Sequence, residues 1–266
     1  KWTFEKLNYF ILSFGHAILT IIISIYYIKI LDLGLESVFY GQLSSSSVFI
    51  VVGLFQARKY LTSRISLNYI KSAYYVGIPI CLISVLGNVI FIIERKTIVL
   101  YLSLSDIAVY SVSLKIVLIL VLFTNTFSTA WTPYAFSIFN KIFIFINLLL
   151  FSIIFFLGYF SHPLIEVLAG SYYYDSSTLV IPLLLSRFYT FSSRFISIGI
   201  YIKKKNFHLI IPQVIYICTF FAVAPVLIQK ELIMGFCKAI LLCSLISFLI
   251  HLFLSYKISD IRFEIA

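Results

Sequence analysis

The sequence predicts an all-α membrane protein with eight transmembrane helices. Hydrophobic residues make up 62% of the 266 residues and charged residues only 11%, and the mean hydropathy is +1.07, whereas soluble domains carry roughly 25% charged residues. The apolar residues also form runs of about 20 residues instead of alternating with polar ones. Because a backbone in lipid must satisfy its own hydrogen bonds, such runs form helices.

The eight helices are expected in chain order, one for each apolar run. At about 1.5 Å per residue, each run is long enough to cross a hydrocarbon layer about 30 Å thick. The first run lacks the small-residue cleavage pattern of a secretory signal. The chain begins with Lys1 instead of Met, so we expect a piece of a longer protein. The runs cover residues 9–31, 38–57, 74–93, 107–131, 143–160, 178–202, 209–228 and 234–254.

Basic residues gather in alternate connections, and this pattern predicts the orientation. Residues 57–72 contain four basic side chains and no acidic one, and residues 203–205 are three lysines. Cytoplasmic loops of membrane proteins collect Lys and Arg. We therefore expect these connections and both termini on the cytoplasmic side. The net charge of +10 is then explained by topology and does not indicate a nucleic-acid partner.

The connections are too short to hold an enzyme's catalytic domain. The longest is 161–177, which contains Glu166 and Asp175 and no basic residue. We interpret both carboxylates as solvated loop groups instead of a catalytic pair. The sequence shows no glycine-rich phosphate loop, no nucleophile elbow and no cluster of metal ligands. It therefore predicts a protein that is not an enzyme and uses no cofactor or metal.

The run 178–202 carries polar side chains on one helix face. Arg187, Thr190, Arg194, Ser197 and Tyr201 follow one another at intervals of three or four residues. At about 100° per residue they fall within an arc of about 80°. Arginine near a helix end often reaches back to the headgroups, which explains Arg194 adequately and Arg187 poorly. The stripe therefore predicts a water-filled cavity.

Other runs show weaker polar faces. Lys115 lies about 12 Å into its run and shares a face with Thr126. Gln42 and Gln56 share a face of 38–57, and Asn88 belongs to a polar face of 74–93. Such Ser, Thr, Asn and Gln residues either mediate helix packing or line the same cavity. We expect Lys115 to belong with the two arginines, and Lys238, near the start of its run, to reach the membrane surface.

The charges of these runs suggest the ligand. Apart from Lys29 at the border of the first run, the basic residues inside spans are Lys115, Arg187, Arg194 and Lys238, and Asp and Glu lie outside them. Ionisable groups at membrane depth usually pair or line a cavity. We therefore expect an anionic ligand, such as a phosphate or pyrophosphate, to supply the missing negative charge. The same pattern leaves no carboxylate within the runs for a coupling proton or sodium ion.

Residues 74–136 contain four short motifs in order: Gly77-Ile78-Pro79, Glu94-Arg95, Tyr110-Ser111 followed by Lys115, and Ala130-Trp131-Thr132-Pro133. With these motifs the stretch resembles the middle of polysaccharide flippases, the Wzx-type O-antigen transporters of the multidrug/oligosaccharidyl-lipid/polysaccharide exporter superfamily. Residues 181–206 resemble the tenth helix of that family and its basic turn. Two positions depart from the family pattern: Glu94 replaces the more usual Asp, and Val109 replaces a small residue.

The resemblance implies an architecture and a function. Family members have about twelve helices in two six-helix lobes related by internal symmetry. Residues 1–72 would be the last two helices of the first lobe with a basic linker, and residues 73–266 the complete second lobe. The implied activity is movement of an undecaprenyl-pyrophosphate-linked oligosaccharide across the bacterial cytoplasmic membrane by alternating access, for O-antigen, lipopolysaccharide or other surface polysaccharide synthesis. Its partners would be membrane lipids and other polysaccharide-assembly proteins.

Three other interpretations stay open. A membrane glycosyltransferase or O-antigen polymerase shares the substrate but is expected to have a large outside loop. A drug exporter of the same superfamily is expected to have carboxylates within its spans. A scaffolding subunit does not require polar faces on several helices. We expect Lys115, Arg187 and Arg194 to bind the anionic group, and Gln42, Gln56, Asn88, Thr126, Thr190 and Ser197 to line the path.

Overall fold

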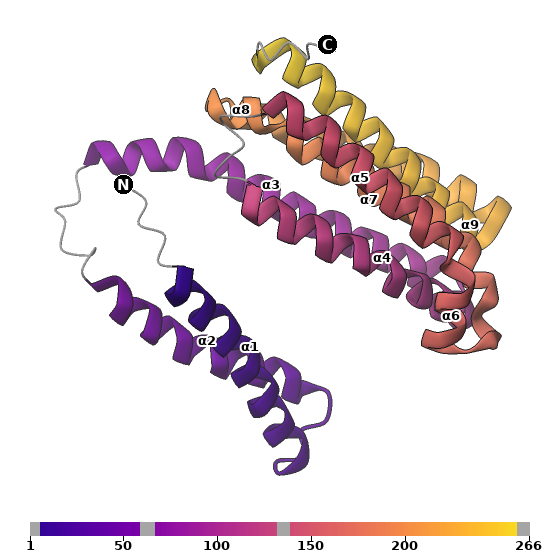
Figure 1. Cartoon of the computed structure of the whole chain (residues 1–266), viewed down its shortest axis with the longest axis horizontal. Coiled ribbons are helices and arrows are strands. Elements are labelled where there is room, and N and C mark those ends of the chain that lie inside the picture. The colour runs from indigo at the N-terminus through magenta and orange to yellow at the C-terminus, as the bar shows by residue number, and fades with distance from the viewer. Residues whose placement is uncertain (1–5, 59–66, 132–138, 260–266) are drawn as a thin grey trace. The chain divides into compact units, whose positions relative to one another are not determined.

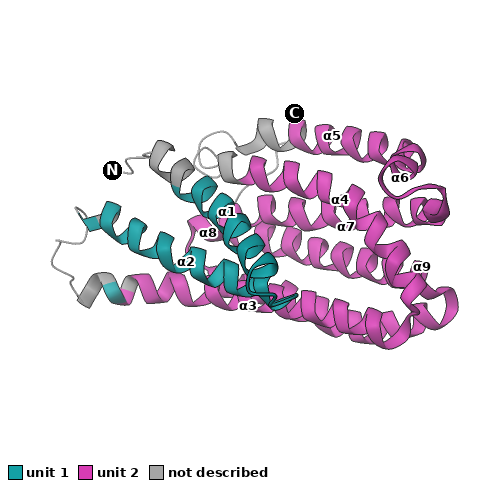
Figure 2. Cartoon of the chain, turned by 90° about the horizontal axis from the view of Figure 1, so that it is seen from below, with its two compact units in different colours: residues 1–70 teal, residues 71–266 magenta. Residues whose placement is uncertain are grey.

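The computed structural model describes residues 6–58, 67–131 and 139–259, and every regular element within them is helical (Figure 1). The predicted all-α class is therefore confirmed. The chain forms two compact units, Lys1–Ile70 and Lys71–Ala266 (Figure 2). The assignment of these units to lobes of a transporter stays a prediction.

Unit 1 is a pair of helices held together by small residues. A Cβ atom at Gly41 would lie 2.1 Å from the Oγ atom of Ser24, so only glycine allows this approach. Small residues at such contacts let two helix backbones come close. The His16 Nε2 and Ser46 Oγ atoms are hydrogen-bonded at 3.1 Å. The two helices are α1 (Lys6–Lys29) and α2 (Glu36–Ala57).

Unit 2 is built around α7, which packs against α4, α5 and α9. Large apolar side chains of all four helices are fully buried there, among them Leu120, Leu150, Leu183 and Phe236. The elements are α3 (Leu67–Tyr101), α4 (Leu104–Trp131), α5 (Phe139–Tyr159), α6 (Ser161–Ala169), η2 (Ser171–Ser176), α7 (Ser177–Ile196), α8 (Ile198–Ile202), η3 (Asn206–Leu209) and α9 (Ile210–Ser259).

Helix α9 is two helices joined at a sharp break. Glu231 and Leu232 have non-helical backbone angles, with Leu232 at φ 50° and ψ −126°. The backbone on the two sides of this break comes very close together. A Cβ atom at Gly235 would lie 2.0 Å from the carbonyl oxygen of Leu227. The two halves correspond to the predicted runs 209–228 and 234–254.

Among the residues that the structure describes, six helical stretches are long and apolar enough to cross a membrane, or up to seven if the bent pair α5 and α6 counts as one span. The two members of that pair meet at a bend of 61°. One stretch, Asn206–Ile258, has 53 residues and contains the break of α9. A straight helix of that length would measure about 80 Å, more than twice the thickness of a hydrocarbon layer.

Three predicted boundaries are wrong. Helix α3 continues to Tyr101 instead of ending at residue 93, so residues 94–101 belong to a helix and not to an outside loop. The predicted loop 161–177 is largely helical, because it contains α6 and η2. The run 178–202 is divided at Ser197, where α7 ends and the short α8 begins. Because α3 continues past residue 93, Glu94 lies within the candidate span Ala73–Tyr101.

Candidate functional site

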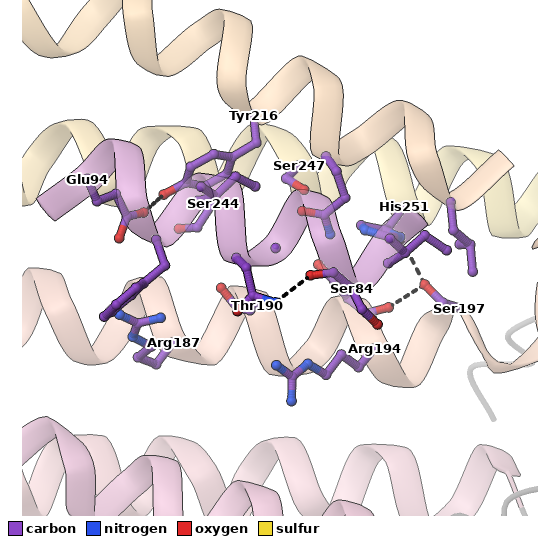
Figure 3. Close-up of a pocket in the computed structure, with 18 of the residues that line it drawn as sticks. Ser84, Glu94, Arg187, Thr190, Arg194, Ser197, Tyr216, Ser244, Ser247 and His251 are labelled. Atoms are coloured by element: carbon purple, nitrogen blue, oxygen red, sulfur yellow. Dashed lines mark hydrogen bonds between the residues drawn. The ribbon is translucent and has the colours of Figure 1, made fainter. Parts of the chain in front are cut away.

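Unit 2 contains a polar cavity of about 530 Å³ between α3, α7 and α9 (Figure 3). Helix α3 contributes Ser84, Asn88 and Glu94, and both halves of α9 contribute polar side chains as well. The cavity therefore places hydrogen-bonding and charged groups inside a unit whose core is otherwise apolar. The polar lining from α9 consists of Gln213, Tyr216, Ser244, Ser247 and His251.

The polar stripe predicted on 178–202 faces this cavity. All five of its members, Arg187, Thr190, Arg194, Ser197 and Tyr201, line the wall. The opposite face of α7 carries buried apolar residues, among them Phe188, Phe195 and Ile196. Helix α7 is thus amphipathic inside the unit: one side packs into the core and the other supplies cavity groups.

Glu94 is the largest departure from the predicted site. It is a buried carboxylate on α3, within the candidate span Ala73–Tyr101. The Tyr216 hydroxyl on α9 donates a hydrogen bond of 2.6 Å to Glu94 Oε1. The carboxylate also interacts electrostatically with Arg187 and Arg95. The expectation that no acidic residue lies within a span is therefore wrong, and it failed because the end of α3 was placed too early.

Arg194 lies at the other end of the stripe in a different environment. Its side chain is exposed, and Nη1 donates a hydrogen bond of 3.4 Å to Oδ1 of Asn125 on α4. It also interacts electrostatically with Tyr201. Arg187, in contrast, is half-buried, so the two arginines of the stripe differ in exposure.

His251 closes the Arg194 end of the cavity. It is buried, and its Nδ1 atom is hydrogen-bonded to Ser197 Oγ at 2.9 Å. One helical turn further on, Ser255 Oγ donates a 2.8 Å hydrogen bond to the carbonyl oxygen of Ile196. These contacts join the C-terminal half of α9 to the end of α7. They also place the imidazole, which was not among the predicted site residues, in the cavity wall.

The α9 groups could have been found from their spacing. Ser244, Ser247 and His251 recur at intervals of three and four residues, and Gln213 and Tyr216 are three residues apart. This is the same helical periodicity that identified the stripe on α7. The signal is weaker because these residues are mostly uncharged and the two sets belong to separate halves of α9.

Of the remaining predicted site residues, some line the cavity and others lie outside its wall. Asn88 lines the cavity together with Thr190 and Ser197. Lys115 and Thr126 are exposed on α4 and are not part of its wall. The cavity thus brings together Arg187 and Arg194 but not Lys115.

Gln42 and Gln56 belong to unit 1. Gln42 is exposed and Gln56 is half-buried. Lys238 forms an ion pair with Glu231 at the break of α9, in which both side chains are partly exposed. Glu166 and Asp175 are both exposed. The described residues contain no group of three or more His, Cys, Asp or Glu side chains that could hold a metal ion.

Comparison of the chain with protein-family models, with curated proteins and with solved structures gives no match. The resemblance to polysaccharide flippases therefore remains an interpretation of the sequence motifs. What the structure supports is a multi-helix candidate membrane protein, whose second unit encloses a polar cavity with two arginines and one buried glutamate.

Proposed function

We propose that the chain is a membrane transporter that moves a lipid-linked oligosaccharide across the bacterial cytoplasmic membrane. The observation that carries the proposal is the polar cavity of unit 2, which exposes Arg187 and Arg194 beside a row of hydroxyl and amide groups. Arginine binds phosphate oxygens through a fixed fork of N–H donors. Hydroxyl and amide side chains suit the hydroxyl groups of a glycan.

The architecture also suits a substrate with a long lipid. The helix surfaces that face away from the core expose large apolar side chains such as Leu118 and Phe155, and these surfaces can contact acyl or polyprenyl chains. The motif resemblance of residues 74–136 to flippases names undecaprenyl pyrophosphate as the carrier. In this proposal residues 73–266 form one helical lobe, which rocks against another around the substrate. Substrate binding biases a two-state equilibrium between inward-open and outward-open forms.

The direct test is equilibrium binding to the purified chain in lipid nanodiscs. A polyprenyl-pyrophosphate oligosaccharide should bind, and the same polyprenyl chain ending in an alcohol should bind much more weakly. Inorganic pyrophosphate should compete with the former. Equal binding of both polyprenyl lipids would refute the proposal, because the cavity would then contribute nothing to recognition.

A cation-coupled exporter of amphiphilic drugs is the second candidate, and the buried Glu94 favours it. A carboxylate in a span can bind a proton or sodium ion, and the sequence alone gave no such group within the predicted runs. An exporter of this type should bind a lipophilic cation such as tetraphenylphosphonium, with an affinity that falls in Glu94→Gln. The flippase should show no saturable binding of this cation.

A further inference from the structure

The end of unit 2 that carries α8 is held together by a second apolar cluster, separate from the main core. Helix α8, η3 and the C-terminal end of α9 all contribute buried side chains to it. The Ser255 Oγ atom of α9 also donates a hydrogen bond to the carbonyl oxygen of Ile196, at the end of α7. The turn after α8 and the end of α9 are therefore fixed together, at the end of unit 2 opposite the break of α9 (Figure 1). The buried members of the cluster are Ile200, Leu209, Leu254 and Ile258.

Lysine residues lie on both of these segments. The turn after α8 is Lys203-Lys204-Lys205, and Lys257 directly precedes Ile258 of the cluster; all four lysines are exposed. The acidic side chains that the structure describes in unit 2 lie elsewhere, so the described residues of this end carry a concentrated positive charge. The acidic residues are Glu94 in the cavity wall, Asp106 in the first turn of α4, Glu166 in α6, Asp175 in η2 and Glu231 at the break of α9.

Lys204 occupies a backbone position that lysine disfavours. Its φ is 55°, in the left-handed region, where a Cβ atom is crowded and glycine is the usual residue. The Lys205 N–H donates to the carbonyl oxygen of Ile200, and the Lys204 N–H to that of Tyr201, which is the common way to end a helix. Glycine at position 204 would close the same turn without strain. The backbone therefore does not explain the lysine, and its charged side chain does.

Exposed aromatic side chains accompany the lysines. Phe207 follows the turn, and Phe253 and Tyr256 lie in the last two turns of α9, with exposed fractions of 49%, 61% and 70%. Tyrosine is enriched where membrane-spanning helices meet the headgroups, and lysines at the cytoplasmic end of a span attract anionic lipids. A surface that combines cations with exposed aromatic rings matches a phospholipid, which joins a charged phosphate to acyl chains. A free phosphate ion would use the cations alone.

We propose that the 203–205 turn and Lys257 form a binding surface for the headgroup of an anionic phospholipid in the cytoplasmic leaflet. The aromatic rings beside them contact the acyl chains near that headgroup. The lipid is a membrane partner of the chain and not its transported substrate, so the site goes beyond the proposed function. The charge pattern of the connections predicts the 203–205 turn on the cytoplasmic side, where anionic lipids give the membrane surface a negative potential.

Native mass spectrometry of the purified chain in a neutral detergent measures lipid binding directly. The unmodified chain should bind dioleoyl phosphatidylglycerol more tightly than dioleoyl phosphatidylcholine, which has the same acyl chains and no net charge. Each lysine near the anionic headgroup should contribute about fivefold to the affinity. Lys205→Gln/Lys257→Gln should therefore weaken binding of phosphatidylglycerol about 25-fold and leave binding of phosphatidylcholine unchanged.

The matched control is Lys96→Gln/Lys230→Gln. It removes two exposed lysines, one near the end of α3 and one beside the break of α9, and so the same number of charges far from the proposed surface. Because charges separated by more than a Debye length are largely screened, this variant should change the affinity for phosphatidylglycerol by less than about twofold.

Lys204→Gly separates the charge of this residue from its place in the fold. Glycine suits the left-handed position, so this variant should melt at the same temperature as the unmodified chain or higher. It should still bind phosphatidylglycerol about fivefold more weakly. A purely structural role of Lys204 would give the reverse pattern, a lower melting temperature with unchanged binding.

Three results would overturn the proposal. The first is equal affinity of the unmodified chain for the two lipids, and the second is an equal loss of phosphatidylglycerol binding in Lys96→Gln/Lys230→Gln and in Lys205→Gln/Lys257→Gln. The third is displacement of phosphatidylglycerol by an equal concentration of glycerol 3-phosphate, because the lysines would then bind a free phosphate and not a lipid.

Discussion

Substituting Gly235 by alanine should weaken the fold of unit 2, because no space exists for a side chain at the turn of α9. An added Cβ atom would lie 2.0 Å from the carbonyl oxygen and 2.4 Å from the carbonyl carbon of Leu227, and 3.0 Å from the nitrogen of Ile228. All three are backbone atoms, so no side-chain rotation relieves the clash. The backbone near the break must move by about 1 Å to restore ordinary contacts, and overpacking of this kind costs about 1–3 kcal/mol.

The expected loss in Gly235→Ala is near the top of that range, about 2–3 kcal/mol. For a unit of this size each kcal/mol lowers the melting temperature by about 2–4 °C, so the shift should be about 5–10 °C downward. The assay is thermal unfolding of the purified chain in detergent, followed by circular dichroism.

Gly77→Ala is the matched control, since Gly77 lies in helix α3 with no atom of another element within 4 Å of the added Cβ. Alanine is the better helix former by about 1 kcal/mol. This variant should therefore melt at the same temperature as the unmodified chain or slightly higher. Equal melting temperatures for the two variants would refute the close approach of the two halves of α9.

Three further substitutions test individual contacts by the same melting assay. Tyr216→Phe removes the donor to the buried Glu94 carboxylate and should cost about 1–3 kcal/mol, the penalty of an unsatisfied buried group. Ser197→Ala removes the hydroxyl bonded to the ring of His251 and should cost about 1 kcal/mol. Lys238→Ala breaks an ion pair whose side chains are 47% and 41% exposed, so it should change stability by less than about 1 kcal/mol.

Exposed residues of the same types provide controls for the first two. Tyr256→Phe removes a hydroxyl from a side chain that is 70% exposed. Ser152→Ala removes a hydroxyl that is exposed on α5 and bonded only within its own helix, to the carbonyl of Leu148. Both variants should have the same melting temperature as the unmodified chain. A Tyr216→Phe variant as stable as Tyr256→Phe would show that the bond to Glu94 does not hold α3 to α9.

Properties of a single helix could be predicted from the sequence, because they depend on length and periodicity alone. The stripe from Arg187 to Tyr201 was found in this way, and its five members all line the cavity. The two halves of α9 were likewise separated, although the break itself depends on backbone angles at Glu231 and Leu232 that no residue type dictates.

Properties that depend on two helices could not be predicted. Lys115 shares a polar face with other residues of its helix, as Arg187 does, but it is exposed on α4 and is not part of the cavity wall. Periodicity identifies which residues share a helix face. It does not show whether that face contacts another helix, the cavity or the surroundings. The partners of Glu94 and Ser197 are 122 and 54 residues distant in the chain, so no local pattern could connect them.

The position of Glu94 in the cavity bears on the charge of the ligand. On sequence alone, the predicted spans contained an excess of cations and no acidic residue. The structure places Glu94 within a span and in the same cavity wall as Arg187 and Arg194, so the cavity offers an acidic group as well as two cations. Arg194 is the more exposed arginine and donates to a neutral side chain, Asn125, so an anionic substrate is best tested at Arg194. The drug-exporter alternative is testable at Glu94, because loss of the carboxylate in Glu94→Gln should weaken binding of a lipophilic cation.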